Sequence, residues 1–361
     1  MLDAIWPAAL AGLLLALLLV PGSRRVALAA KVVDRPGRRK LQGEAVPLLG
    51  GAAVLLAVAG GSWAGVWWNG APVPAGTLPA VLGALCVFLV GLIDDLRKHR
   101  GGLSARSKFG LQLVAVLLLC SGRISALSDG TGGTGGTGEW LALFVLLLVL
   151  LSVINAANVV DNMNGLSAGL VLISAAALLL FGNGFLDAGH RLALAALAGA
   201  LLGFLPFNFP RARSYLGDAG SYLIGYLIGL FALQLTTGFL DLPARPIRLA
   251  GALPALLPAL LLVGLPLFDL TFVVVRRLLE RRPICSGDAR HLSHRLVGAG
   301  LSPVQAVSLL LFLQLMMVAA GGSILLAGAG AKAAVTAAVA LLFSIGAAWL
   351  VAFERRGRGL P

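Results

Sequence analysis

The chain has 361 residues, of which 59% are hydrophobic and only 12% are charged. A soluble domain carries roughly a quarter charged residues, so this composition excludes an ordinary soluble protein and predicts a polytopic membrane protein. The net charge of +13 is explained by membrane topology and by attraction to anionic lipid. We therefore expect the lipid bilayer, and no nucleic acid, as a partner.

Apolar stretches recur along the whole chain, and each is long enough to cross a hydrocarbon core of ~30 Å with about 20 residues. They predict an all-α fold with about ten or eleven transmembrane helices, in a single transmembrane domain that covers residues 1–361. The expected spans are, in chain order, 5–22, 46–67, 76–93, 107–122, 140–156, 165–182, 191–207, 219–240, 250–275, 303–328 and 334–353.

The positions of Lys and Arg predict the orientation of these spans. All but five of the 28 basic residues lie in alternate loops and at the C-terminus, and the exceptions are Arg123, Arg191, Arg245, Arg248 and Lys332. Cytoplasmic loops carry the excess of positive charge. The sequence therefore predicts that these basic loops are cytoplasmic and that the N-terminus lies outside.

Polar residues collect in five clusters in or beside the loops predicted to be cytoplasmic. The first holds Arg38, Arg39 and Lys40 between turn residues. Its cations suit a phosphate, although an ordinary membrane anchor explains them when the cluster is taken alone.

The second cluster is the acidic pair Asp94 and Asp95 at the end of the third span, with Lys108 entering the fourth. Adjacent carboxylates repel each other and need a cation nearby. Carboxylates that face a lysine suit metal or phosphate chemistry, and the alternative is an ion-pair network at a helix end.

The third cluster contains Asn155, Asn158, Asp161 and Asn164, which recur at every third position. On a helical backbone they form one polar stripe, which must face a protein interior or a water-filled cavity. The alternative is hydrogen bonding between helices.

The fourth cluster runs from Tyr215 to Ser221 and enters the eighth span. Its glycines let the backbone approach an anion, and Ser221 with the amides of a helix N-terminus can bind one. Asp218 beside this nest would hold a divalent metal, whereas a glycine-rich turn with an N-cap is the alternative explanation.

The fifth cluster contains His291, His294 and Arg295, whose spacing predicts one shared helix face. Imidazoles with a guanidinium suit an anionic substrate better than a zinc ion here. Together the five clusters supply carboxylates for Mg²⁺, cations for phosphates and a glycine nest, which are the components of phosphoryl transfer. The sequence contains no GxxxxGK[ST], GxSxG or HExxH motif.

The motifs resemble those of the polyprenyl-phosphate N-acetylhexosamine-1-phosphate transferases. The resemblance runs in order through DRPGRRK…PLLGG, GLIDDLRK…KFGLQ, NAANVVDNMNGLSAGL, YLGDAGSYLIG and PLFDLTFVVVRRL…DARHLSHRLVGAGLS. The last motif is more similar to the branch that initiates surface glycans than to the branch that adds the peptidoglycan muramyl-pentapeptide.

The resemblance implies transfer of an N-acetylhexosamine 1-phosphate, expected to be N-acetylglucosamine 1-phosphate, from a UDP-sugar to undecaprenyl or another polyprenyl phosphate. UMP would leave, and Mg²⁺, with Mn²⁺ as an alternative, would be the cofactor. The family also implies a bacterial cytoplasmic membrane, and it suggests a homodimer.

Residue roles follow from the same resemblance. It implies catalytic roles for four residues, namely Asp94, Asp95, Asp161 and His291. The implied metal ligands are Asp218 and Asn158. The implied substrate-binding residues are Arg38, Arg39, Lys40, Lys108, Asn155, Asn164, Tyr215, Ser221, His294 and Arg295.

The chain departs from the family pattern at four positions. Asn164 replaces the second Asp of DGxDG, Ser293 replaces the middle histidine of HxHH, and Gln42 and Ala45 stand where His and Pro are common. A non-catalytic relative that binds the lipid carrier is therefore one alternative. A transporter is another, but its polar residues would be expected at the membrane midplane.

Overall fold

The computed structural model describes residues 5–34, 45–73, 77–128, 137–182, 186–237, 249–283 and 291–326. Most of these residues are helical. The helices are α1 (Trp6–Ala29), α2 (Gly50–Asn69), α3 (Thr77–Arg97), α4 (Ala105–Ser128), α5 (Thr137–Val159), α6 (Leu166–Phe181), α7 (Ala188–Asn208), α8 (Gly217–Thr237), α9 (Leu249–Leu262), α10 (Gly264–Leu279), α11 (Leu292–Gly298) and α12 (Pro303–Leu326).

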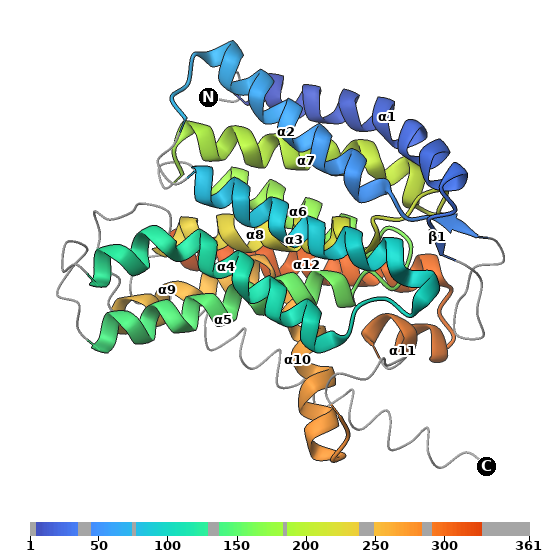
Figure 1. Cartoon of the computed structure of the whole chain (residues 1–361). Coiled ribbons are helices and arrows are strands. Elements are labelled where there is room, and N and C mark those ends of the chain that lie inside the picture. Colours follow the sequence, from blue (N-terminus) through green and yellow to red (C-terminus); the bar gives the residue numbers. More distant parts are fainter. Residues whose placement is uncertain are drawn as a thin grey trace.

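The helices confirm the predicted class of an all-α polytopic membrane protein. Within the described ranges, seven helices are long and apolar enough to cross a membrane, and the bent pair α9–α10 adds an eighth. A helix satisfies its backbone hydrogen bonds internally, which is what hydrocarbon demands. Most helices run side by side in one bundle, while α10 projects away from it (Figure 1). The expected span at 334–353 lies outside the described residues.

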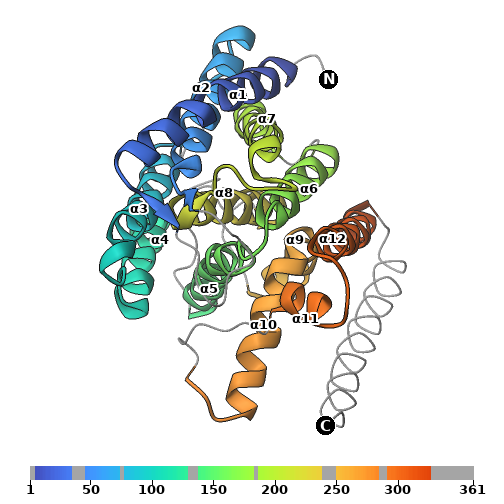
Figure 2. The same cartoon turned by 90° about the vertical axis from the view of Figure 1, so that its right-hand side faces the viewer.

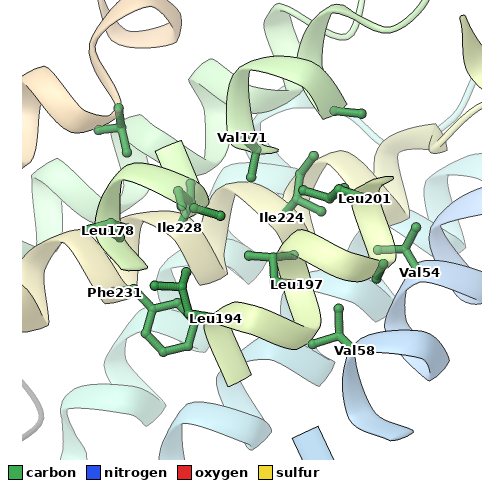
Figure 3. Packing of buried hydrophobic residues seen from close by; sticks show 14 of the residues in the cluster. Val54, Val58, Val171, Leu178, Leu194, Leu197, Leu201, Ile224, Ile228 and Phe231 are labelled. Atoms are coloured by element: carbon green, nitrogen blue, oxygen red, sulfur yellow. The ribbon is translucent and has the colours of Figure 1, made fainter. Parts of the chain in front are cut away.

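Helix α8 is the centre of the bundle, as the end-on view shows (Figure 2). In its stretch Gly217–Leu235, 89% of an 18-residue window is buried, against 28% for α1. Small residues let other helices approach it closely, as is common in membranes. Gly51 of α2 packs directly on Gly220 of α8. Branched aliphatic side chains of α8 pack against those of α2, α6 and α7 and form the core beside this helix (Figure 3).

The span expected at 250–275 is two helices that meet at 93°, so the expectation of one continuous helix is wrong. Pro266 has no N–H, and its ring clashes with the carbonyl four residues earlier, which belongs to Leu262. Gln314 of α12 replaces the lost bonds, because it donates to the Leu262 carbonyl at 2.9 Å and accepts from the Leu265 N–H at 2.9 Å. The break is therefore stabilised from a neighbouring helix.

A small antiparallel pair of strands, which the sequence analysis did not predict, lies between α1 and α2. Strand β1 (Val33–Asp34) pairs with β2 (Val46–Pro47), with Val33 opposite Pro47. The Pro47 carbonyl accepts the Tyr215 N–H at 2.8 Å. The strands thus fix the loop before α8 at one end of the bundle.

Candidate active site

A pocket of about 750 Å³ opens at the end of the bundle where α3 and α5 end and α8 and α12 begin. Its polar lining comes from segments far apart in the chain. These lining residues are Asp34, Lys98, Asn158, Asp161, Asn162, Asn164, Arg211, Tyr215, Asp218 and His294. Carboxylates and cations therefore face one space, as the clustering in the sequence predicted.

Asp218 is the carboxylate that joins the pocket to the acidic pair of α3. Its Oδ2 accepts from Lys108 Nζ at 2.8 Å, and the same Nζ donates to Asp94 Oδ2 at 2.7 Å. Lys98 Nζ lies 3.9 Å from Asp218 Oδ1 and 3.7 Å from Asp95 Oδ1. Two lysines thus offset the charge of three carboxylates. The acidic pair Asp94 and Asp95 therefore has cations nearby, as its charge repulsion predicted.

Asp95 is buried and caps the N-terminus of α8. Its two oxygens accept the N–H groups of Asp218 at 3.1 Å and Ala219 at 3.0 Å. A carboxylate at this position satisfies unpaired amides and interacts favourably with the helix dipole. The contact requires Gly91, because a Cβ there would collide with the backbone of Asp218 and Ala219.

The expected stripe on α5 is confirmed for three of its four members. Asn158, Asp161 and Asn164 line the pocket, the last two from the turn Val160–Gly165 that follows the helix. Asn155 does not, because it lies a turn deeper in α5 and donates to Gln112 of α4 at 2.7 Å. For Asn155 the alternative, hydrogen bonding between helices, is correct.

Ser221 is fully buried in the first turn of α8. Its hydroxyl donates to the Gly217 carbonyl at 3.0 Å and accepts from Asn158 Nδ2 at 2.9 Å. The hydroxyl is thus engaged within the protein and does not line the pocket, so the expected anion contact is not formed by this side chain. The bond leaves the Asn158 side-chain oxygen as the atom of that amide available to a cation.

Two loop residues on the pocket wall have raised pKa values. Desolvation, followed by the charge of Asp218, raises the pKa of Asp161 to about 7. Desolvation, followed by the charge of Asp34, raises the pKa of Tyr215 to about 12. The tyrosine therefore faces the pocket as a neutral phenol.

The three residues of the histidine motif do not share one face, because His291 and Arg295 contact α10 whereas His294 lines the pocket, so the expected shared face is wrong. His291 precedes α11 and its Nδ1 lies 2.8 Å from Asp269 Oδ2 of α10. The Arg295 guanidinium lies over the Phe272 ring at 4.7 Å. Only His294 lines the pocket, and burial, followed by the charge of His291, lowers its pKa. Helix α11 lies between α10 and α12 (Figure 2), so some of its side chains contact α10 while His294 reaches the pocket.

The remaining expected residues, Arg38, Arg39 and Lys40, lie outside the described ranges. Lys98, Asn162 and Arg211 line the pocket although the sequence analysis gave them no role. The spacing of Lys98 three residues after Asp95 was a usable signal, because residues i and i+3 are neighbours on a helix. We find no comparable signal for Arg211.

Asp218, Asp161 and the Asn158 oxygen are the candidate ligands for a divalent cation. Among the described residues, no three His, Cys, Asp or Glu side chains form a metal-binding group. Mg²⁺ is usually held by one or two carboxylates with several waters and substrate phosphates. Two carboxylates and an amide on one pocket wall fit that ion better than they fit zinc.

The fold and the site define a multi-span membrane protein with a pocket of carboxylates and cations at one end of its bundle. Residues 77–236 match the family model described as "Glycosyl transferase family 4". The "Probable undecaprenyl-phosphate N-acetylglucosaminyl 1-phosphate transferase" of Bacillus subtilis (strain 168) is 30% identical over 80% of this chain and 76% of the relative.

Two further relatives extend this likeness. The "Decaprenyl-phosphate N-acetylglucosaminephosphotransferase" of Mycolicibacterium smegmatis is 33% identical over 92% of this chain and 85% of the relative. The "Undecaprenyl-phosphate alpha-N-acetylglucosaminyl 1-phosphate transferase" of Escherichia coli (strain K12) is 27% identical over 80% and 75%. The chain belongs to the polyprenyl-phosphate N-acetylhexosamine-1-phosphate transferase family, as its motifs predicted.

Proposed function

We propose that this protein transfers N-acetylglucosamine 1-phosphate from UDP-N-acetylglucosamine to undecaprenyl phosphate or a related polyprenyl phosphate, and releases UMP. The names of its relatives support the sugar and the lipid. The observation that carries the proposal is Asp218, a pocket carboxylate at a helix N-terminus within reach of two lysines. The product would initiate a lipid-linked surface glycan.

The pocket has the size and chemistry that a nucleotide sugar requires. Its volume of about 750 Å³ lies within the range of about 300–1,000 Å³ for small-molecule sites. Tyr215 offers a flat neutral ring to a uracil base, while Lys98, Arg211 and His294 offer donors to phosphate and sugar oxygens. A long prenyl chain would stay in the bilayer and present only its phosphate.

We assign Mg²⁺ to Asp218, Asp161 and Asn158, with Mn²⁺ as an alternative ion. When bound, it would neutralise charge on the donor diphosphate. The raised pKa of Asp161, caused by desolvation and by the charge of Asp218, supports this assignment. Carboxylates that disfavour joint ionisation gain most from a cation between them.

The reaction needs little proton transfer. A phosphate monoester has a second pKa near ~6, so the acceptor is mostly a dianion at neutral pH. An acceptor oxygen forms a bond to the sugar-bearing phosphorus, and the bond from that phosphorus to the bridging oxygen breaks, which leaves the electron pair on UMP. Asp94 and Asp95, which hold Lys108 and α8, then act through position and charge rather than as bases.

We further propose that the pocket opens on the cytoplasmic side of a bacterial cytoplasmic membrane, with the N-terminus outside. The basic residues beside the pocket, such as Lys98, Lys108 and Arg211, support this orientation. The homodimer suggested by the resemblance stays a prediction, which light scattering of the purified protein tests.

A panel of UDP-sugars with undecaprenyl phosphate tests the proposed function in purified protein. We expect UMP release with UDP-N-acetylglucosamine and Mg²⁺, and none after chelation with EDTA. Asp218→Asn should abolish release, whereas Asp187→Asn at the N-cap of α7 should not, because Asn also caps well. Lipid binding without UMP release from any donor would instead identify a non-catalytic relative.

A further inference from the structure

The turn Val160–Gly165 carries three polar pocket residues, and two of them are bonded to other elements. Asn164 Nδ2 donates to the Pro210 carbonyl at 3.1 Å. Asn162 Oδ1 accepts from the Ser293 hydroxyl of α11 at 2.6 Å. The third, Asp161, lines the pocket. Asn162 and Asn164, which follow Asp161 in the turn, are thus bonded to α11 and to the loop at Pro210, both remote from the turn in sequence.

The bond from Asn164 requires an amide. The Pro210 carbonyl can only accept, so the atom that faces it must be a donor, and an ionised carboxylate has none. An Asp at this position, which the family motif favours, would place its charge against the carbonyl oxygen. The departure from the motif at Asn164 therefore creates a contact that the usual residue cannot make.

Ser293, the second departure, has a similar use. It is only 2% exposed and does not line the pocket, whereas its neighbour His294 does. Its short hydroxyl reaches Asn162, whose Nδ2 in turn donates to the Val159 carbonyl at 2.8 Å. The serine therefore ties α11 to the turn that follows α5.

Other bonds hold the loop before α8 and the last residue of the turn, Gly165, without Asn164. Buried Asn208 accepts from the Gly165 N–H at 2.7 Å and donates to the Ser214 carbonyl at 2.9 Å. Backbone bonds to Pro47 and Gly50 fix Tyr215 independently. Loss of the Asn164 bond should therefore disturb the part of the turn before Gly165, which includes Asp161, more than the nucleotide side of the pocket.

We propose that Asn164 and Ser293 are positioning residues, which clamp the Val160–Gly165 turn to the Pro210 loop and to α11 and so set the place of Asp161 in the pocket. The inference rests on the proposed function, because sugar-phosphate transfer is its main readout. It assigns a role to two of the four residues that depart from the family pattern, and it predicts that restoring the family residue at position 164 is harmful.

Steady-state kinetics of Asn164→Asp test the first clamp. We expect kcat to fall about ten- to a hundredfold, as for small misplacements of reacting groups, with KM for the UDP-sugar changed less than about threefold. Asn69→Asp is the matched control, because Asn69 makes the same amide-to-carbonyl bond to Gly65 at the other end of α2. Its kinetics should equal those of the unsubstituted protein.

Asn164→Ala removes the donor without adding a charge, so it should lower kcat less than Asn164→Asp does. It also provides the reading if Asn164→Asp does not yield folded protein. A rise in KM with unchanged kcat would overturn the proposal, because that pattern belongs to a direct nucleotide contact. Unchanged or improved kinetics of Asn164→Asp would overturn it as well.

A double-mutant cycle tests the second clamp. Ser293→Ala and Asn162→Ala should each lower kcat, and the double variant should be no worse than the poorer single variant. Ser323→Ala, on the distant part of α12 where the hydroxyl bonds only to its own helix, should have no effect. If the losses of kcat in the two single variants add in the double variant, Ser293 and Asn162 do not act together, and the proposed second clamp is wrong. Failure of the proposed function is a different result, since the unsubstituted protein would then release no UMP.

Discussion

Lys108 Nζ lies 2.8 Å from Asp218 Oδ2, although the two residues are 110 positions apart in the chain. The same ammonium lies 2.7 Å from Asp94 Oδ2. A single cation therefore joins the end of α3 to the start of α8, where both carboxylates are shielded from water. Carboxylates this close favour ionisation only when such a cation is present.

Lys108→Met should lower the transfer rate about a hundredfold, a loss typical of removing one placed charge from a polar site. The carboxylates of Asp94 and Asp218 would then repel each other without their shared partner. UMP release measures the effect, and gel filtration checks that the variant stays folded. Arg106→Met, at an exposed position on the same helix, should retain activity. Full activity of Lys108→Met would show that the bridge has no role in transfer.

Gly91→Ala should destabilise the protein by about 1–3 kcal/mol, as overpacking does, and should reduce transfer. The added Cβ would meet the backbone of Asp218 and Ala219, so α3 and α8 would separate and the cap from Asp95 would weaken. Thermal unfolding in detergent measures the loss. Gly110→Ala in α4, where a Cβ would meet nothing within 4 Å, should leave stability equal or slightly higher. Equal melting temperatures for both variants would contradict this account.

Composition and charge predict much of the fold, because hydrocarbon accepts only closed backbone structures. The break at Val263 between α9 and α10 was not predicted. Pro266 signals a disturbed helix, but Gln314 of α12 bonds to both sides of the break, and no local pattern reveals that contact. The pair of strands was not predicted either, because each strand has only two residues and so shows no recognisable alternation.

The candidate site was predictable where charge is costly and therefore rare. Asp94, Asp95 and Asp218 stand out in an apolar sequence, and the structure brings them together beside Lys108 and Lys98. The directions of the side chains were less predictable, because sequence spacing alone does not show which neighbouring residue a side chain contacts. His291 therefore binds Asp269 rather than facing the pocket.

Asp269→Asn tests how α10 positions the histidine motif. Asp269 is buried, and its oxygens lie 2.8 Å from His291 Nδ1 and 2.7 Å from the Leu292 nitrogen. The amide can replace only one of these acceptors, so we expect a loss of about 1–3 kcal/mol and weaker transfer. Thermal unfolding and UMP release provide the measurements.

Glu280→Gln at the end of the same helix is the matched control. Its ion pair with Arg276 is partly exposed and is worth about 0–1 kcal/mol. A smaller loss for Asp269→Asn than for Glu280→Gln would show that the buried pair does not organise α11.

Gln314→Leu should destabilise the protein by about 2–5 kcal/mol, because two buried backbone groups would each lose a hydrogen bond. Leucine has a similar size but cannot bond to the Leu262 carbonyl, whose helical partner would be the N–H that Pro266 lacks. It also cannot accept from the Leu265 N–H, which lies in the first turn of α10. Thermal unfolding measures this loss. Gln305→Leu, at the exposed start of α12 where the side chain accepts only from Ser302, should cost much less. If the two variants unfold at the same temperature, the bend between α9 and α10 is held by packing rather than by Gln314.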